Sequence, residues 1–454
     1  MRSWSPEQIA QAAGARLLSV ATNGSGPERA VVDSRDAGPG ALFVGVRGTR
    51  ADGGQYATDV LRDGAWGVLT SGEHAETAAE HSAAGVVLAA DDPLVALQRL
   101  ATAWRRELGA AVIGVTGSTG KTSTKDLLLA VLAPHRRTVA SRGNFNTEVG
   151  LPLEILAAPA GTEVLVLEMA MRGAGQIAEL AAIAEPDVGV IVSVGPVHLE
   201  LLGSLDAIAA AKAELLAGLA AGATAVVPAG EPLLERHLRD DLETVTFGDE
   251  GDVRLLGSEP GRVEIGVGGE RIALRVNFEQ AHLRDNLLAA VAAARAVGAT
   301  PSGSVELALS PGRGQRAQLT GDVMLIDDCY NANPMSMRAA LDELAATARR
   351  DHRDRRVAVL GDMLELGETE RQLHERIGEH AAEAGVDLLI TVGPLAHSIG
   401  AGYGGSAHSV PDAAAAAELV PGLLRPGDVV LVKGSRGVGL ELVCRTLSPE
   451  DRAG

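Results

Sequence analysis

The chain contains few aromatic residues and almost no cysteine. Its 454 residues include only four Phe, three Trp, three Tyr and two Cys. Because large aromatic side chains are so rare, the hydrophobic cores must be built mainly from Ala, Val and Leu. Cys329 and Cys444 are too few for a disulfide framework, and they lack the spacing of zinc ligands. The sequence therefore favours neither a disulfide scaffold nor a structural zinc site.

The chain also lacks long apolar runs and an excess of positive charge. No apolar stretch is long enough to span a bilayer, and the first ten residues carry charged and polar groups where a signal peptide would be apolar. The net charge is −19, from 40 basic and 59 acidic residues. Nonspecific nucleic-acid binding requires a basic surface. We therefore expect a cytoplasmic protein with no membrane insertion and no nucleic-acid partner.

The length of the chain exceeds what one hydrophobic core supports, and apolar residues make up 46% of it. We predict three α/β domains, at residues 1–106, 107–310 and 311–454. The first begins with an amphipathic helix over 4–13, for which Ser5 is the N-cap, and continues with short strands such as 41–46. Strands and helices alternate in the other two domains, which is typical of parallel sheets with crossover helices.

Apolar runs in the second and third domains predict strands that end in polar or glycine-rich segments. They cover 111–115, 164–167, 188–194, 223–227 and 243–247 in the second domain, and 323–326, 357–360, 388–392 and 429–432 in the third. Ligands of parallel sheets gather where the strands end. The third domain has no compact Gly-x-Gly-x-x-Gly, so we expect a Rossmann-like sheet that binds no dinucleotide.

Residues 114–123, with the sequence GVTGSTGKTS, are typical of a phosphate-binding loop. A predicted strand precedes this loop, and a predicted helix over 124–131 follows it. Backbone N–H groups of such a loop point at a phosphate, Lys121 supplies positive charge, and the hydroxyl of Thr122 can hold Mg²⁺. Val115 replaces the usual first glycine, so the motif is a variant. Because a chance Gly-Lys-Thr rarely has this strand and helix around it, we predict that the loop binds ATP.

Four further features have both a functional and a structural interpretation. Glu168 ends a predicted strand and is either a Mg²⁺ ligand beside the phosphate loop or a solvated strand end. A lone His198 is more often a structural histidine, and Lys212, on a predicted helix over 205–219, is more often a surface charge. The segment 327–334, DDCYNANP, is rich in hydrogen-bonding groups, but a capped turn has a similar composition. Residue type alone leaves these alternatives open.

Taken together, the motifs resemble those of the Mur ligase superfamily over nearly the whole chain. The matching segments are 33–35, 39–44, 52–53, the phosphate loop, 143–146, 150–152, Glu168, His198, Lys212, His282, Asn286, 312–313, 327–334, 361–367, His374 and 433–436. The phosphate loop marks only the superfamily. The segments DDCYNANP and GDMLELG resemble the branch that joins D-alanyl-D-alanine to UDP-N-acetylmuramoyl-tripeptide.

The resemblance implies an ATP-dependent ligase with an N-terminal nucleotide-sugar-binding domain, a central P-loop domain with a parallel sheet, and a C-terminal Rossmann-like domain. The implied catalytic residues are Lys121, Glu168, His198 and Lys212. The ATP phosphates would be bound by Gly117, Ser118, Thr119, Gly120, Lys121, Thr122 and Ser123. Asn286 would contact adenine, Arg313 the γ-phosphate and Asp328 the ribose.

The resemblance also implies two Mg²⁺ ions. Thr122 and Glu168 would hold the first ion, and His198 would help to hold the second. Lys212 matches a lysine that reacts with CO₂ to form a carbamate. Such a carbamate replaces a cation by an oxygen ligand that can support Mg²⁺.

The implied substrates are UDP-N-acetylmuramoyl-tripeptide and D-alanyl-D-alanine, joined by a monomeric enzyme of peptidoglycan synthesis. Ser34 and Arg35 would bind the uridine diphosphate end, and Asn144 and Asn146 would line the route to the reaction centre. The third domain would help to bring in the dipeptide through three residues, which are Asn331, Asn333 and Asp362.

A few positions depart from the family pattern, namely Gly54, Thr147, residues 228–230 and Cys329. None of these is an implied phosphate or metal ligand. The alternatives are another amino-acid ligase of the superfamily and a non-catalytic ATP-binding relative. A folylpolyglutamate synthetase carries its phosphate loop near the chain start, and the ligase that adds the third residue uses a DNPR segment that this sequence lacks. Retention of all four implied catalytic residues argues against loss of catalysis.

Overall fold

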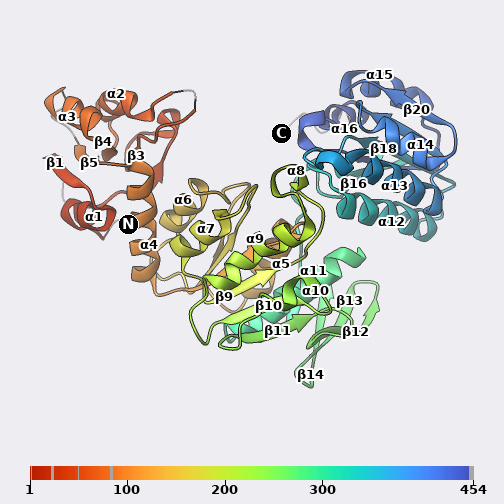
Figure 1. Ribbon diagram of the computed structural model, residues 1–454, viewed down its shortest axis with the longest axis horizontal. Coiled ribbons are helices and arrows are strands. Elements are labelled where there is room, and N and C mark those ends of the chain that lie inside the picture. Colours follow the sequence, from red (N-terminus) through yellow and green to blue (C-terminus); the bar gives the residue numbers. More distant parts are fainter. Residues whose placement is uncertain (2, 22–24, 50, 82–84, 449–454) are drawn as a thin grey trace.

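The computed structural model describes residues 1, 3–21, 25–49, 51–81 and 85–448, which fold around three separate sheets (Figure 1). The strands of these sheets lie within residues 16–90, 111–305 and 315–433. The predicted α/β architecture with three domains is confirmed, whereas the exact domain limits stay predictions. Among the described helices, none combines the length and the apolar character needed to cross a bilayer.

The first sheet has five strands in the order β1-β5-β4-β3-β2, and only β1 is antiparallel to its neighbour. Ser5 caps the first helix as predicted, since its hydroxyl accepts a hydrogen bond from the backbone N–H of Gln8. The predicted strand over 41–46 ends at Val44. The elements are α1 (Pro6–Ala13), β1 (Arg16–Ala21), β2 (Arg29–Val31), η1 (Ser34–Asp36), β3 (Ala41–Val44), η2 (Gly53–Tyr56), α2 (Ala57–Arg62), β4 (Gly67–Ser71), α3 (Gly72–His81), β5 (Gly85–Ala90) and α4 (Pro93–Leu108).

The second sheet has ten strands in the order β15-β14-β13-β12-β11-β10-β9-β6-β8-β7. Its strands are β6 (Ala111–Thr116), β7 (Thr138–Ala140), β8 (Val164–Glu168), β9 (Val188–Ile191), β10 (Thr224–Pro228), β11 (Glu243–Phe247), β12 (Val253–Glu259), β13 (Arg262–Val267), β14 (Glu270–Val276) and β15 (Gly303–Val305). Its helices are α5 (Lys121–Leu132), α6 (Gly150–Ala157), α7 (Gln176–Ala184), α8 (Leu199–Leu202), α9 (Leu205–Ala217), α10 (Pro232–Glu235) and α11 (Ala281–Ala296).

The expectation of a parallel sheet is right from β7 to β12 and for the pair β14 and β15, and it is wrong from β12 to β14. There, β12, β13 and β14 form an antiparallel meander. The turn between β13 and β14 consists of Gly268 and Gly269, which both have positive φ angles, 54° and 87°. Two such residues suit the tight turn of a hairpin. Buried and exposed residues alternate along β14, as expected for a strand with one solvated face.

The third sheet has six strands in the order β16-β17-β21-β18-β19-β20, and only β16 is antiparallel to its neighbour. All four strands predicted for this domain are present. The elements are β16 (Gln315–Leu319), β17 (Val323–Asp327), α12 (Pro334–Arg350), β18 (Arg355–Gly361), η3 (Gly367–Thr369), α13 (Glu370–Glu383), β19 (Leu388–Val392), α14 (His397–Tyr403), β20 (Ala407–Val410), α15 (Ala413–Leu423), β21 (Asp428–Lys433), η4 (Arg436–Val438) and α16 (Glu441–Leu447).

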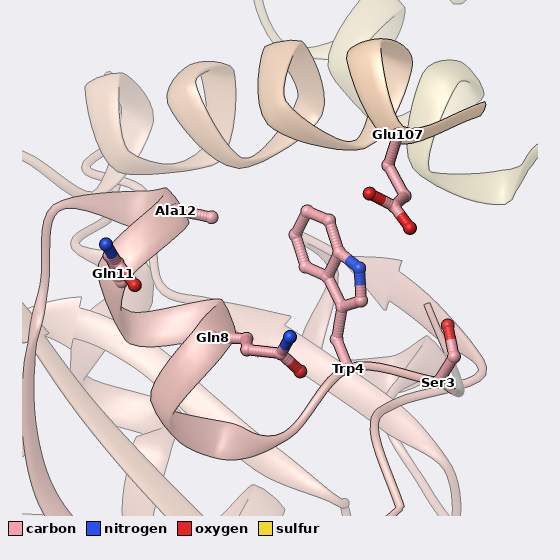
Figure 2. A pocket seen from close by; sticks show the side chains of 6 residues that line it. All are labelled: Ser3, Trp4, Gln8, Gln11, Ala12 and Glu107. Atoms are coloured by element: carbon pink, nitrogen blue, oxygen red, sulfur yellow. The ribbon is translucent and has the colours of Figure 1, made fainter. Parts of the chain in front are cut away.

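The first and second domains share a continuous apolar core. Helix α4 lies between them, and its buried residues belong to one cluster that includes Ile9 of the first domain and Ile155 of the second. The indole of Trp104 packs edge-on against Trp4 with 5.3 Å between ring centroids, and its Nε1 donates to the carbonyl of Ala158 at 3.1 Å. A small cavity of about 400 Å³ lies beside Trp4 at this junction (Figure 2). The two domains are therefore joined as one body.

The third domain meets the second through polar contacts. Arg350 pairs with Glu279 at 2.9 Å, and the backbone N–H of Glu200 donates to the carbonyl of Glu365 at 3.2 Å. Within the described part of the chain, the buried apolar clusters of the third domain contain no residue of the second. Figure 1 shows the third domain on the opposite side of the central domain from the first.

We expect Trp104→Ala to lower the free energy of unfolding by about 3–5 kcal/mol, because it opens a cavity in the shared core and removes a hydrogen bond. Urea unfolding followed by circular dichroism measures this loss. The control is Val95→Ala on the same helix, where the side chain is 37% exposed and the change should stay within about 0.5 kcal/mol. Equal effects of the two substitutions would contradict the assigned role of α4.

Candidate functional site

A cavity of about 1130 Å³ opens between the second and third domains. Most of the predicted site residues line it, although they come from distant parts of the sequence. They are Ser118, Thr119, Gly120, Lys121, Thr122, Ser123, Asn144, Asn146, Glu168, His198, Asn286, Arg313, Asp328, Asn331 and Asn333. Five predicted residues do not line it, namely Ser34, Arg35, Gly117, Lys212 and Asp362.

The phosphate loop leads from β6 into α5, which begins at Lys121, earlier than predicted. Gly120 has a φ of 79°, and a Cβ there would lie 2.6 Å from Oδ1 of Asn286. Both the backbone conformation and the close approach of α11 therefore require glycine at this position. The first hydrogen bond of the helix runs from the N–H of Thr124 to the carbonyl of Gly120 at 2.8 Å. The preceding N–H groups lie at the positive end of the helix, where an anion is stabilised.

Lys121 is folded back onto its own loop. Its Nζ donates to the carbonyl of Gly117 at 2.7 Å. Burial lowers the pKa of Lys121, and the nearby Arg313 lowers it further, whereas Glu168 opposes the shift. A bound polyphosphate would add negative charge beside this amine and stabilise its charged form.

Glu168 lies at the end of β8 and is buried beside the phosphate loop. Its Oε2 accepts a hydrogen bond from the hydroxyl of Thr122 at 2.8 Å, and its Oε1 accepts one from the side-chain amide of Asn146 at 2.8 Å. The backbone N–H of Glu168 donates to the hydroxyl of Ser141 at 3.0 Å. The structure therefore places a fixed carboxylate and a hydroxyl together, and such hard oxygen donors suit Mg²⁺.

His198 lies in the loop after β9, directly before α8. It has a φ of 54°, a left-handed conformation that is uncommon outside glycine. Its Nδ1 is hydrogen-bonded to Oε2 of Glu365, which belongs to the third domain. Burial lowers the pKa of His198, and the charges of Lys121 and Lys212 add to that effect, although Glu365 opposes it. The imidazole is therefore biased toward its neutral form, which is the form that binds metals.

Lys212 is buried on α9, with 2% of its surface exposed. The interpretation of a lone helical lysine as a surface charge is therefore wrong for this residue. Burial lowers the pKa of Lys212 far below its usual range, and repulsion from Lys121 contributes. Within the described structure, no carboxylate is recorded in a salt bridge with its amine. Lys212 does not line the cavity, but its amine is electrostatically coupled to Lys121 and His198.

The third domain contributes a second polar wall. The guanidinium of Arg313 stacks on the ring of Tyr330, with 4.1 Å from Cζ to the ring centroid. Lys433, at the end of β21, is buried and donates to Oδ2 of Asp328 at 2.6 Å and to the carbonyl of Asn331 at 3.0 Å. Lys433 belongs to a family motif, but no role was predicted for it from the sequence. The signal for such a role is that this lysine directly follows the apolar run 429–432.

Two predicted substrate contacts have structural roles in the described conformation. Asn333 is the N-cap of α12, and its Oδ1 accepts a hydrogen bond from the N–H of Ser336 at 2.9 Å. Asp362 is buried, and its Oδ1 accepts a hydrogen bond from the N–H of Ala396 at 2.6 Å. Burial raises the pKa of Asp362. Asn333 still lines the cavity, whereas the carboxylate of Asp362 is engaged by the turn before α14.

Ser34 and Arg35 form η1 in the first domain, away from the large cavity. Arg35 is exposed, and its guanidinium pairs with Asp33 at 2.5 Å. This pairing holds the pKa of Asp33 at about 2. The structure thus does not bring these two residues to the phosphate loop, and their role at the uridine diphosphate end stays a prediction.

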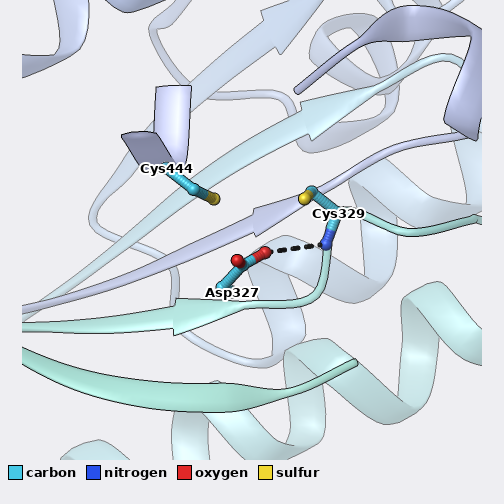
Figure 3. Close-up of side chains that lie close together, drawn as sticks. All are labelled: Asp327, Cys329 and Cys444. Carbon is cyan, nitrogen blue, oxygen red and sulfur yellow. Dashed lines mark hydrogen bonds between the residues drawn. The ribbon is translucent and has the colours of Figure 1, made fainter. Parts of the chain in front are cut away.

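The two cysteines lie side by side, although 114 residues separate them in the sequence. Cys329, Cys444 and Asp327 place their ligand atoms within 4.8 Å of one another (Figure 3). Both thiols are free and buried. The neighbouring Cys329, together with burial, raises the pKa of the Cys444 thiol. The thiol of Cys444 therefore resists ionisation.

The fold and the site define a multidomain P-loop protein with its cavity between two α/β domains. The family model of the Mur ligase middle domain matches residues 115–294, and that of the Mur ligase glutamate ligase domain matches residues 312–436. The chain belongs to the Mur ligase family.

Individual relatives extend this similarity over the whole chain. The UDP-N-acetylmuramoyl-tripeptide–D-alanyl-D-alanine ligase of Mycobacterium tuberculosis is 38% identical over 98% of both chains. The crystal structure of MurF from Acinetobacter baumannii superposes with a TM-score of 0.85 at 27% identity, covering 98% of this chain and 99% of that one. MurF from Thermotoga maritima, solved in complex with ADP, has a TM-score of 0.80 at 30% identity, with coverages of 93% and 97%.

The segment 361–367 borders the site and depends on a buried histidine. Nε2 of His374 accepts a hydrogen bond from the N–H of Met363 at 2.9 Å, and Nδ1 bonds to the carbonyl of Glu370 at 2.7 Å. Burial lowers the pKa of His374 below its usual 6.5. The unfolded chain therefore binds a proton at this position at a higher pH than the folded chain does.

We expect His374 to make the protein less stable as the pH falls below about 6.5, by up to about 1.4 kcal/mol per pH unit. Urea unfolding between pH 5.5 and 7.5 tests this. The stability difference between the wild type and His374→Asn should grow as the pH rises through this window. The control is the same substitution at His408, which is exposed on β20. A constant difference at both positions would rule out a buried neutral His374.

Proposed function

We propose that the protein is an ATP-dependent ligase that joins D-alanyl-D-alanine to UDP-N-acetylmuramoyl-tripeptide. Relatives that carry this name and are 30–38% identical cover more than 90% of the chain. The observation that carries the proposal is the interdomain cavity, where the phosphate loop, Glu168 and His198 face Arg313 and Asp328. The acidic chain, with a net charge of −19, binds no nucleic acid in this role. It works as a monomer in the cytoplasm, where ATP and nucleotide-linked precursors are found together.

The reaction proceeds through an acyl phosphate. The terminal carboxylate of the tripeptide attacks the γ-phosphorus of ATP, a new O–P bond forms, and ADP leaves with the electrons of the broken bond. The amine of D-alanyl-D-alanine then attacks the carbonyl carbon, loses a proton and expels phosphate. Phosphoryl transfer of this kind depends on positioning and charge stabilisation more than on covalent chemistry by the protein.

The main obstacle is that a carboxylate must approach a polyanion. Lys121 and Arg313 supply two cations, and Arg313 lies close enough to lower the pKa of Lys121. Both would stabilise negative charge as it shifts onto the transferred phosphoryl group. Asn286 adjoins Gly120 at the far side of the loop, in a position that suits the adenosine part of ATP.

The donor groups fit divalent metal ions. Thr122 and Glu168 offer a hydroxyl and a carboxylate, and His198 offers an imidazole nitrogen, all lining one cavity. When bound, Mg²⁺ neutralises phosphate charge and orients the reacting oxygens. Thr122 is already hydrogen-bonded to Glu168, so the two oxygen donors need no rearrangement to act together.

Lys212 has the properties of a carbamylation site. CO₂ reacts with a neutral amine, and the strongly lowered pKa of the buried Lys212 favours that form. The amine of Lys212 lies near the amine of Lys121 and the imidazole of His198. A carbamate on Lys212 would therefore place a negative charge beside these two basic groups. It would thereby supply a further oxygen ligand for the second metal ion.

The first domain would bind the uridine diphosphate end of the tripeptide substrate through Ser34 and Arg35. Asn144 and Asn146 line the cavity on the side of the second domain and would guide the peptide toward the phosphate loop. Asn331 and Asn333 lie on the opposite wall, where they would help to admit D-alanyl-D-alanine. Asp362, directly after β18, would support this wall through its hydrogen bond to Ala396.

Phosphate release with ATP, the tripeptide nucleotide and different amine acceptors tests the function. D-alanyl-D-alanine should support turnover, whereas single amino acids should not. Lys121→Ala should lower kcat at least about 100-fold by removing a cation from the transferred phosphoryl group. Arg371→Ala, which removes an exposed cation from α13, should have no effect. Turnover with a single amino acid would identify a different ligase of the family, and no turnover at all would identify a non-catalytic relative.

A carbamate on Lys212 leads to a separate prediction. Lys212→Ala should be nearly inactive and should regain part of its activity when short carboxylic acids are added, because these replace the missing oxygen ligand. A ¹³C NMR spectrum of the wild type in labelled bicarbonate should contain a carbamate signal that the variant lacks. Full activity of the variant, or an identical spectrum, would show that Lys212 is not modified.

A further inference from the structure

Glu365 reaches from the third domain to the imidazole of His198. It lies in the segment 361–367 and accepts a hydrogen bond from Nδ1 of His198. Arg172 lies 3.8 Å from the other oxygen of Glu365, so a cation also contacts this carboxylate. No role was predicted for Glu365 from the sequence, although it belongs to the GDMLELG motif.

The two residues belong to loops that interlock across the domain boundary. His198 and Glu365 both have left-handed backbone conformations, with φ of 54° and 64°. Such conformations are unfavourable for residues other than glycine and persist only where the surroundings hold them. The N–H of Glu200 donates to the carbonyl of Glu365 at 3.2 Å, and a Cβ on Gly367 would lie 3.1 Å from Cα of Glu200. The backbone itself therefore fixes this contact.

Hydrogen bonds within the third domain also hold the loop of Glu365. The N–H of Met363 donates to the buried His374, and the N–H of Leu364 donates to the hydroxyl of Ser435 at 3.0 Å. The position of the Glu365 carboxylate is thus set by the core of the third domain. It reaches His198 only while that domain is docked on the second.

A neutral imidazole has one nitrogen that donates and one that accepts. A carboxylate bonded to Nδ1 requires the proton on Nδ1, which leaves the lone pair on Nε2. Histidines that bind metals usually donate their other ring N–H to such a carboxylate, and the loss of that partner weakens metal binding about 10–100-fold.

We propose that Glu365 is a positioning residue, which fixes the tautomer and orientation of His198 so that Nε2 is its metal-binding nitrogen when the third domain is docked. This inference rests on the metal-binding role of His198 in the proposed function. It makes the second metal site a composite, with its ligand in one domain and the support of that ligand in another. A purely structural contact between domains would instead leave metal binding independent of Glu365.

The test measures Mn²⁺ binding by electron paramagnetic resonance in the presence of ATP, with Mn²⁺ as the probe for Mg²⁺. His198→Ala first identifies which bound ion depends on the imidazole. Glu365→Ala should lower the affinity for that same ion about 10-fold or more. Glu365→Gln should lower the affinity less, since an amide oxygen still accepts a hydrogen bond from Nδ1. The matched control is Glu368→Ala, which removes an exposed carboxylate three residues further along the chain and should leave both ions unchanged.

A second readout does not depend on the variants folding equally well. The ¹⁵N spectrum of histidine-labelled wild type should show His198, assigned by its loss in His198→Ala, with the proton on Nδ1. The Nε2–H tautomer in the wild type would overturn the proposal, as would unchanged Mn²⁺ affinity in Glu365→Ala. Neither measurement uses the ligase reaction, so absence of turnover with D-alanyl-D-alanine would refute the proposed function alone.

Discussion

The site depends above all on the register between β6 and β8. The parallel ladder pairs Val115 with Glu168, so the carboxylate emerges at the level where the phosphate loop begins. The ladder between β6 and β9 pairs Thr116 with Ile191, the last residue of β9. The loop that carries His198 therefore begins at the same edge of the sheet as the phosphate loop. Because successive side chains of a strand point to opposite faces, a slip of one residue would turn Glu168 away from Thr122. Backbone hydrogen bonds thus fix the relative positions of groups that are more than 40 residues apart.

Around this fixed edge, the described conformation brings several basic groups together. Arg313 lowers the pKa of Lys121, Lys121 lowers the pKa of Lys212, and both lysines lower the pKa of His198. Glu168 and Glu365 offset this repulsion only in part. A polyphosphate ligand removes the repulsion, so part of its binding free energy comes from relief of unfavourable contacts in the free protein.

The sequence predicted the phosphate loop, the strand before Glu168 and the α/β architecture because each follows from local patterns. It could not predict the burial of Lys212, since the helix around it is rich in Ala and Leu and shows little contrast between its faces. The contact of Glu365 with His198 and that of Lys433 with Asp328 require knowledge of tertiary placement. The meander β12–β14 was not predicted, because charged residues interrupt its strands and leave none of the continuous apolar runs that mark buried strands. The roles of individual site residues stay predictions that rest on resemblance.

The apolar junction formed by α4 has a consequence for substrate choice. Since the first and second domains share one core through Trp104, a motion that changes the span from η1 to the phosphate loop would have to open that core. Under the proposed function, this span would act as a molecular ruler for the nucleotide-linked peptide. A chain one residue too short would leave its carboxylate out of reach of the phosphoryl group unless the core opened. Selection for peptide length would therefore reside in a packed joint distant from any reacting atom.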